Sequence, residues 1–220
     1  MTPILYAIGD VHGQARLLVS LLDAIRQHAG DEVWRVVFIG DYIDRGPDSA
    51  GVLSIAQDLH ADGRAVCLLG NHERVLLDAV SDPAAMERWM KLSGATTLAS
   101  FGTDTIAGIP PGVIDWLTGL PTFHEDALRY YVHAGLNPER PLQDQTDHDR
   151  LWMRGRFLTE EHDFGKFIVH GHTPQMTGQP DLHPYRVNLD TAVGQTGILT
   201  AGIFDQTQGA PTGFLHAHAS

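Results

Sequence analysis

Three short apolar runs in the first third of the chain each end in a polar cluster that contains glycine, and this repeated pattern constrains the fold most. The clusters are GDVHG at residues 9–13, GDYIDRG at residues 40–46 and GNHE at residues 70–73. Short apolar runs bounded by turn residues predict buried strands. Because the carboxyl ends of strands in an open α/β sheet form the ligand crevice, we expect the three polar loops to meet at one sheet edge.

Strands and helices are predicted to alternate in this part of the chain. Strands are expected at residues 4–8, 34–39 and 65–69, and apolar residues recur at helical spacing over residues 17–25 and 52–59. This alternation is typical of βαβ units that feed a parallel or mixed sheet.

The segment from about residue 81 to residue 126 interrupts the alternation. It carries helical patches at residues 86–92 and 113–120, separated by turn residues, and is interpreted as a small helical insertion beside the crevice. Apolar runs then return and favour a second sheet, at residues 128–132, 167–169, 185–189 and 198–204. The expected fold is α/β: one domain over residues 1–220, built as a four-layer αββα sandwich with mixed sheets. Residues 216–220 are expected to be frayed.

Composition and charge narrow the classes of function. The chain is 43% hydrophobic and 19% charged, as in ordinary globular proteins. A formal net charge of -12 argues against a general nucleic-acid binder, because such proteins carry basic surfaces. The start of the chain shows no signal peptide and no membrane span is evident, so a cytoplasmic protein is expected. The single cysteine, Cys67, lies in an apolar run and is predicted to be a buried thiol.

Carboxylate, imidazole and amide side chains collect in the three clusters and after two later apolar runs. They are Asp10, His12, Asp41, Asn71, His133 and His172. A ligand set without thiolates suits hard to borderline divalent cations, with Mn²⁺ as the first choice and Fe²⁺, Zn²⁺ or Mg²⁺ as alternatives. Six ligands are too many for one ion that keeps positions open for substrate. Two ions that share a bridging carboxylate are expected, an arrangement suited to in-line displacement at phosphorus.

The three clusters resemble the motifs GDxHG, GDxxDRG and GNHE of the phosphoprotein phosphatase (PPP) family of metallophosphoesterases. HAGL at residues 133–136 resembles the family's HGG motif, with Ala134 in place of the middle glycine. HGHTP at residues 170–174 resembles the GHT motif of bacterial and bacteriophage members. The resemblance extends over residues 9–191 and implies a calcineurin-like, dinuclear metal-dependent phosphatase.

The resemblance also assigns the metal ligands. It implies that Asp10 and His12 bind the first ion and that Asp41 bridges both. It implies that the second ion is completed by Asn71, His133 and His172.

Further roles follow from the same resemblance. It implies that His72 is the general acid that protonates the leaving oxygen, with Asp44 as its partner. A carboxylate beside an imidazole favours the proton-donating form and fixes the ring. Arg45 offers a forked donor suited to phosphate oxygens. A second phosphate-binding arginine is expected at Arg154, with Arg156 as the alternative.

Other polar residues receive structural interpretations. His170 lies two positions before His172 and is expected to lie behind the ligands rather than to bind metal. Asp190 is expected either to orient a ligand histidine or to serve packing or a turn. The remaining histidines considered are expected at the surface: His28, His60, His124, His148, His162 and His183.

The motif forms favour a protein serine/threonine phosphatase that hydrolyses phosphomonoesters, with a phosphoprotein or a small phosphoester as substrate. The expected mechanism is direct attack of a metal-bridging hydroxide, without a phosphoenzyme. The alternative is a bis(5'-nucleosyl)-tetraphosphatase, which hydrolyses diadenosine tetraphosphate. The forms GNHE, DRG and GHT favour the phosphatase, since the alternative class tends to carry GNHD and another residue after the last GH. A non-catalytic scaffold is disfavoured because every ligand and the acid are present. The native metal, the substrate and the oligomeric state stay open.

Overall fold

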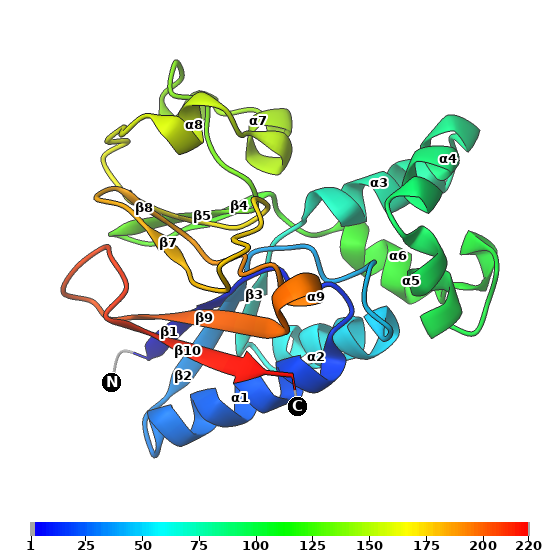
Figure 1. Ribbon diagram of the computed structural model, residues 1–220, viewed down its shortest axis with the longest axis horizontal. Coiled ribbons are helices and arrows are strands. Elements are labelled where there is room, and N and C mark those ends of the chain that lie inside the picture. The colour runs from blue at the N-terminus through cyan, green and yellow to red at the C-terminus, as the bar shows by residue number, and fades with distance from the viewer. Residues whose placement is uncertain (1–2, 220) are drawn as a thin grey trace.

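The computed structural model describes residues 3–219, which form two five-stranded mixed sheets stacked on one another (Figure 1). The first sheet has the order β10-β9-β1-β2-β3 and consists of β1 (Ile4–Ile8), β2 (Trp34–Phe38), β3 (Ala65–Cys67), β9 (Ile198–Phe204) and β10 (Gly213–His218). The second has the order β4-β5-β6-β8-β7 and consists of β4 (Phe123–Glu125), β5 (Arg129–Val132), β6 (Phe167–His170), β7 (Asp181–Leu182) and β8 (Arg186–Asn188).

Both sheets have a parallel centre and antiparallel edges. In the first sheet β1, β2 and β3 run parallel, and β9 and β10 add on antiparallel to one side. In the second sheet β5, β6 and β8 run parallel, with β4 and β7 antiparallel at the edges. Parallel strands need long crossover connections, which α1 (Ala15–Ala29) and α2 (Ser49–Ala61) supply between β1, β2 and β3.

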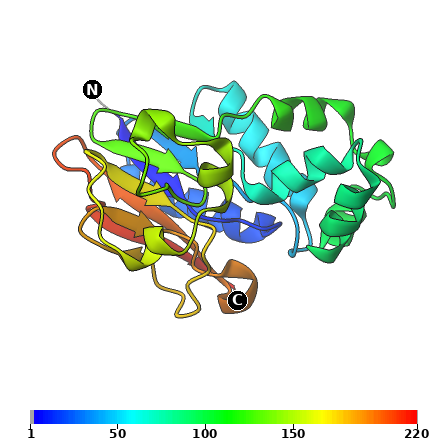
Figure 2. The same cartoon turned by 90° about the horizontal axis from the view of Figure 1, so that it is seen from above.

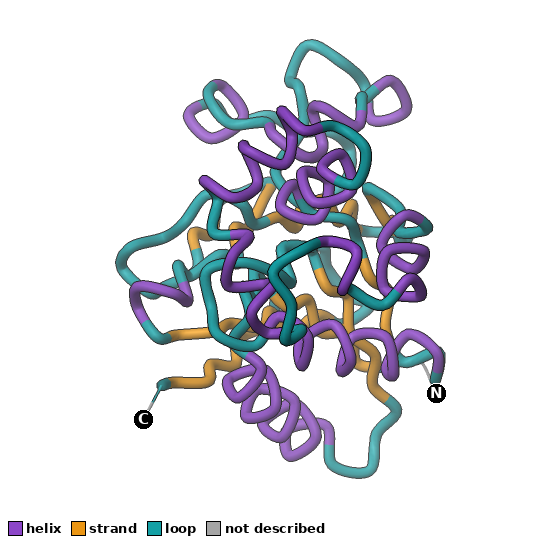
Figure 3. Tube along the Cα trace, turned by 90° about the vertical axis from the view of Figure 1, so that its right-hand side faces the viewer, coloured by secondary structure: helices purple, strands orange, loops and turns teal. Residues whose placement is uncertain are grey.

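Apolar residues on both faces of each sheet create the layers. In β1, Tyr6 and Ile8 join the core cluster beneath α1 and α2, whereas Ala7 joins the cluster between the two sheets with Tyr131 of β5. On the outer face of the second sheet, Phe157 of α8 packs in a third cluster. The outer helices there are α7 (Asp147–Trp152) and α8 (Arg156–Thr159), and strands run between helices on either side (Figure 3). The predicted four-layer α/β sandwich is confirmed.

The helices that lie between β3 and β4 in the chain form a lobe at one side of the molecule (Figures 1 and 2). It follows α3 (Asn71–Ala79) and consists of α4 (Pro83–Lys91), α5 (Gly94–Ser100), the 3₁₀ turn η1 (Ile106–Gly108) and α6 (Pro111–Thr118). In this lobe α4 packs on α3, and α5 packs on α2. The insertion predicted at 81–126 is helical, but its last residues, Phe123–Glu125, form β4 and pair with β5. A strand of three residues is too short to show an alternating pattern in the sequence. It is recognised only by its pairing with β5.

The C-terminal segment also differs from expectation. Residues 216–218, expected to be frayed, belong to β10, and His216 Nδ1 lies 2.9 Å from the hydroxyl of Thr200. Pairing with β10 covers an edge of β9 that would otherwise expose unpaired backbone groups. The remaining elements are η2 (Leu142–Asp144) and α9 (Val193–Thr196). Within residues 3–219, no helix combines the length and the apolar character that a membrane span requires.

Candidate active site

Seven predicted site residues meet where strands of both sheets end. They are Asp10 and His12 after β1, Asp41 after β2, Asn71 and His72 after β3, His133 after β5 and His172 after β6. All seven side chains are buried. The convergence expected from the sequence is therefore present, with each sheet contributing loops.

The backbone of these loops adopts an uncommon conformation. Seven non-glycine residues of the described chain have positive φ, and five of them are predicted site residues: His12 (45°), Asp41 (53°), Asp44 (71°), Arg45 (67°) and His172 (66°). Such conformations cost on the order of 1–3 kcal/mol each and persist only where the surrounding structure enforces them. The packing of the two sheets thus holds these side chains in one place.

Glycines allow the loops to approach one another. A Cβ on Gly171 would collide with the carboxylate of Asp10. A Cβ on Gly40, which has φ 100°, would lie 2.6 Å from the Cα of Gly70. The glycines of the clusters therefore serve close backbone contact around the site.

One group of candidate ligands contains Asp41, His133 and His172, whose ligand atoms lie within 4.8 Å of one another. His133 Nδ1 lies 2.9 Å from the carbonyl oxygen of Ile39, so Nδ1 donates and Nε2 keeps its lone pair. That Nε2 faces Asn71 Oδ1 at 2.8 Å and Asp41 Oδ1 at 3.3 Å. Three acceptor atoms that face one another repel, and a cation between them would turn this repulsion into coordination.

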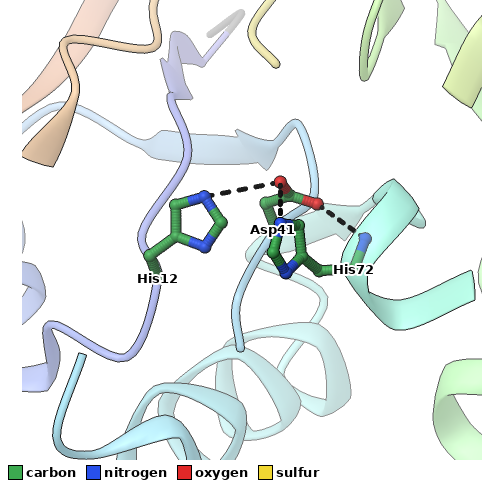
Figure 4. Close-up of side chains that lie close together, drawn as sticks. All are labelled: His12, Asp41 and His72. Carbon is green, nitrogen blue, oxygen red and sulfur yellow. Dashed lines mark hydrogen bonds and ion pairs between the residues drawn. The ribbon is translucent and has the colours of Figure 1, made fainter. Parts of the chain in front are cut away.

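A second group contains His12, Asp41 and His72, whose rings and carboxylate point toward one another in Figure 4. His12 Nδ1 lies 2.9 Å from the carbonyl oxygen of Ile43 and donates to it. His12 Nε2 lies 3.5 Å from Asp41 Oδ2 and has no hydrogen-bond partner in residues 3–219. A buried nitrogen lone pair without a partner is uncommon, and this one is suited to binding a cation.

Three histidines of the site, His12, His133 and His172, favour the neutral form that can bind a cation. Burial lowers the pKa of His12 to about 3 and that of His172 to about 2, and it also lowers the pKa of His133. Burial alone would raise the pKa of Asp41, but the nearby histidines, His133 first, outweigh it and hold this pKa below its ordinary value.

The surroundings of Asp10 disfavour the ionised form of its carboxylate. Its oxygens accept hydrogen bonds from the backbone N–H of His172 at 3.2 Å. Burial, with Asp190 and Asp41 close by, raises the pKa of Asp10 well above its ordinary value. Crowded buried carboxylates beside neutral imidazoles are the donor set that divalent cations stabilise, so the residues present fit such ions.

His72 is directed by a different neighbour from the other histidines. Its Nδ1 lies 2.6 Å from Asp44 Oδ2, while its Nε2 lies 3.9 Å from Asp41 Oδ2 and 3.3 Å from the guanidinium of Arg45. Burial alone would lower the pKa of His72, but Asp41 and the hydrogen bond with Asp44 outweigh it and raise the pKa. Asp44 therefore fixes the ring and leaves Nε2 facing the site.

Two exposed arginines flank the site. A cleft of about 270 Å³ is lined by Arg45, Asn71, His72, Leu92, Trp152, Arg154 and His172. Arg154 donates to the carbonyl oxygen of His172 at 3.1 Å. Arg156, the alternative, instead forms ion pairs with Glu139 and Glu160 and does not line this cleft. Of the two arginines, Arg154 is the one that lines the cleft beside the histidines.

The profile of the calcineurin-like phosphoesterase family matches residues 5–195, which include every predicted site residue. The chain belongs to this family. Its members are metal-dependent hydrolases of phosphoric esters, and this calcineurin-like chain has two groups of side chains able to hold divalent ions.

Curated relatives in the family are named symmetrical bis(5'-nucleosyl)-tetraphosphatases. The chain is 32% identical over 145 residues to that of Nitrosospira multiformis and 37% identical over 141 residues to that of a Marinomonas species. Each match covers 63% of this chain and 46% of the relative, so the chain spans about half the length of the curated relatives that it matches. The crystal structure of a candidate diadenosine tetraphosphatase has a TM-score of 0.72 at 24% identity, covers 100% of this chain and 95% of its own, and shows the shared fold.

The prediction of a protein serine/threonine phosphatase acting on phosphoprotein monoesters was wrong. The relatives carry the name of the class held as the alternative. That prediction depended in part on glutamate, rather than aspartate, at position 73. In the structure Glu73 is fully buried and its carboxylate accepts hydrogen bonds from the backbone N–H groups of Asp41, Tyr42, Ile43 and Gly70. This residue therefore holds the loops together and does not line the cleft at the site.

Two polar residues beside the site belong to no recognised motif. Trp89 of α4 and Thr97 of α5 are fully buried and both donate hydrogen bonds to the carboxylate of Asp44. A tryptophan in a helical patch is usually a core residue, so no pattern in the sequence indicates this contact.

His170 and Asp190 lie beside the candidate ligands, and the structure gives the contacts of both. His170 is buried against Phe157, with ring centroids 4.9 Å apart, and burial lowers its pKa to about 3. Asp190 accepts a hydrogen bond from the backbone N–H of Ala192, as a turn residue does. Among the described hydrogen bonds of Asp190, none joins a histidine, so the turn interpretation fits better than the orienting one.

Proposed function

We propose that this protein hydrolyses bis(5'-nucleosyl) tetraphosphates symmetrically, to two nucleoside diphosphates. The observation that carries the proposal is the identity of 32% and 37% to relatives named symmetrical bis(5'-nucleosyl)-tetraphosphatases, over 63% of this chain. The metal-site residues and the acid lie within the family match.

A second cleft supports a substrate larger than a phosphomonoester. It has a volume of about 440 Å³, and its lining includes Asn137, His148 and Met153. Trp152 and Arg154 line both this cleft and the cleft at the metal site. A long substrate could therefore place its phosphates at the histidines and a nucleoside beyond Trp152, whose ring offers a face for base stacking.

The proposal assigns the metal ligands in two sets. Asp10, His12 and Asp41 would hold one divalent cation, and Asp41, Asn71, His133 and His172 would hold the other. When bound, two such ions, with Mn²⁺ as the first choice and Fe²⁺, Zn²⁺ or Mg²⁺ as alternatives, would neutralise phosphate charge and acidify water.

The side chains of the chain do the remaining work. Arg45 and Arg154 bind phosphate oxygens at the rim of the cleft. His72 holds a proton at Nε2 and delivers it to the leaving phosphate oxygen, while Asp44 keeps the ring in place. Because the second pKa of a phosphate is about 6, this leaving group needs less protonation than an alkoxide does.

The test compares substrates and products directly. The purified protein is stripped with a chelator, reloaded with each candidate cation, and supplied with diadenosine tetraphosphate or a phosphoserine peptide. We expect ADP as the nucleotide product and negligible release of phosphate from the peptide. An Asp41→Ala variant purified in parallel controls for contaminating hydrolases. Formation of AMP and ATP, or no turnover of the dinucleotide with any cation, would refute the proposal.

A further inference from the structure

The carboxylate of Asp44 is enclosed by donors from three separate elements. His72 Nδ1 lies 2.6 Å from Oδ2, the hydroxyl of Thr97 donates to Oδ1 at 2.6 Å, and Trp89 Nε1 lies 3.1 Å from both oxygens. All four side chains are buried, and those of Asp44, Trp89 and Thr97 are fully so. The carboxylate thus has a donor on each side and no free direction in which to rotate.

Thr97 also holds the backbone of the same residue. The N–H of Asp44, which has φ 71°, donates to Thr97 Oγ1 at 2.9 Å and to Ser49 Oγ at 3.1 Å. The two hydroxyls lie 3.1 Å apart. One threonine therefore stabilises both a strained backbone conformation and the direction of the side chain attached to it.

Trp89 is held in place by the turn between α4 and α5. Ser93 in that turn has φ 81°, and a Cβ on Gly94 would lie 2.6 Å from the indole ring of Trp89. The backbone of Gly94 thus packs directly against the indole ring. This contact and the hydrogen bond to Asp44 together hold the indole N–H toward the carboxylate.

We propose that Trp89 and Thr97 are positioning residues that aim His72 at the leaving group through Asp44. The helical lobe would then do more than border the crevice, since α4 and α5 would set the efficiency of proton delivery. The inference rests on the proposed hydrolase function, in which His72 is the acid. It concerns neither the metal ligands nor the identity of the nucleoside.

The test removes the hydrogen-bond donor of Thr97 or Trp89 while keeping a side chain of similar size. Thr97→Val keeps the shape and deletes the hydroxyl, Thr97→Ser restores a hydroxyl, and Trp89→Phe deletes the indole N–H. Thr118→Val and Trp116→Phe are matched controls, since Thr118 donates to Ile114 O within α6 and Trp116 donates to His60.

Activity is read with leaving groups of different basicity. Proton delivery matters most when the leaving oxygen is basic, so a misplaced His72 should lower kcat for phenyl phosphate about 10-fold or more in Thr97→Val and Trp89→Phe. With p-nitrophenyl phosphate, whose leaving group needs little protonation, the loss should be within about 3-fold. KM should change little, and Thr97→Ser should recover most of the loss. Equal losses for both leaving groups would overturn the proposal.

A second measurement does not depend on turnover. The proton on His72 Nδ1, in a 2.6 Å hydrogen bond, should give a downfield NMR signal in the metal-free protein. The signal should weaken or disappear in Thr97→Val and Trp89→Phe while their circular dichroism stays that of the parent. It should persist in the two control variants. An unchanged signal in both test variants would overturn the proposal.

The two proposals fail in distinguishable ways. If the parent cleaves the aryl phosphates but not diadenosine tetraphosphate, the proposed substrate is wrong and the role of Trp89 and Thr97 is still measured. If the dinucleotide is cleaved but the leaving-group series shows no difference between variants and parent, the proposed substrate stands and the positioning role falls.

Discussion

Replacing Glu73 by glutamine is expected to be the most destabilising conservative change near the site. One oxygen of Glu73 accepts from the backbone N–H groups of Tyr42 at 2.8 Å and Ile43 at 3.2 Å. The other accepts from those of Asp41 at 2.9 Å and Gly70 at 3.0 Å. An amide keeps one acceptor oxygen and sets its NH₂ group against the two N–H donors on the other side.

The magnitude follows from the two lost bonds. A buried backbone N–H left without an acceptor costs about 1–3 kcal/mol, so the free energy of unfolding should fall by about 2–6 kcal/mol in Glu73→Gln. The loss cannot be relieved by water, because Glu73 is fully buried. The exposed Glu87 in α4 offers the matched control, for which Glu87→Gln should stay within about 0.5 kcal/mol of the parent.

The assay is urea unfolding followed by circular dichroism, with chelator present so that metal binding does not add to the stability. Parent, Glu73→Gln and Glu87→Gln are compared at one pH and one protein concentration. A Glu73→Gln protein within about 1 kcal/mol of the parent would show that the four backbone contacts do not hold the loops as described.

Four further outcomes are expected. His72→Asn should keep its metal content, measured by elemental analysis, and lose about 100-fold or more in turnover of a phenyl or alkyl phosphate; unchanged turnover would remove His72 from its role. Asp41→Ala should lose bound metal and activity together, and activity without metal would contradict the bridging role. Arg154→Ala should raise KM for the dinucleotide, with Arg156→Ala near the parent; the reverse order would reassign the second arginine. Burial raises the pKa of the Cys67 thiol to about 12, so a thiol reagent at pH 8 should modify it only after unfolding, and rapid modification of the native protein would contradict this.

Elements with a strong local pattern could be predicted from the sequence. The structure has strands at Ile4–Ile8 and Ile198–Phe204, the ranges expected from the apolar runs. The expected place of the second strand was wrong, because Ile198–Phe204 pairs with β1 in the first sheet and does not join the second. β4 and β10 could not be recognised in the same way, because the three residues of the first and the His-Ala-His end of the second show no distinctive run. Their structure depends on hydrogen bonds to β5 and β9, which the local sequence does not encode.

Within the site, too, some contacts could be predicted from the sequence and others could not. The residues in motifs were expected to meet, and His133 and His172 lie beside Asp41 although 92 and 131 positions separate them from it in the printed sequence. Trp89 and Thr97 follow no motif, and their contact with Asp44 appears only when α4 and α5 fold back onto the loop after β2. Positioning contacts of this kind are set by tertiary packing, which a single sequence does not reveal.

The predicted substrate was wrong because the motifs indicate the metal-binding loops, whereas other residues select the substrate. Motif residues such as His133 and Glu73 are buried. Their side chains could hold a cation or bind backbone N–H groups, tasks shared by enzymes with different substrates. Selection has to occur where a substrate extends beyond the metal site. In this chain that region is the surface around Trp152 and Arg154, which joins the two clefts and lies outside the three N-terminal clusters. Glu73 lines neither of these clefts.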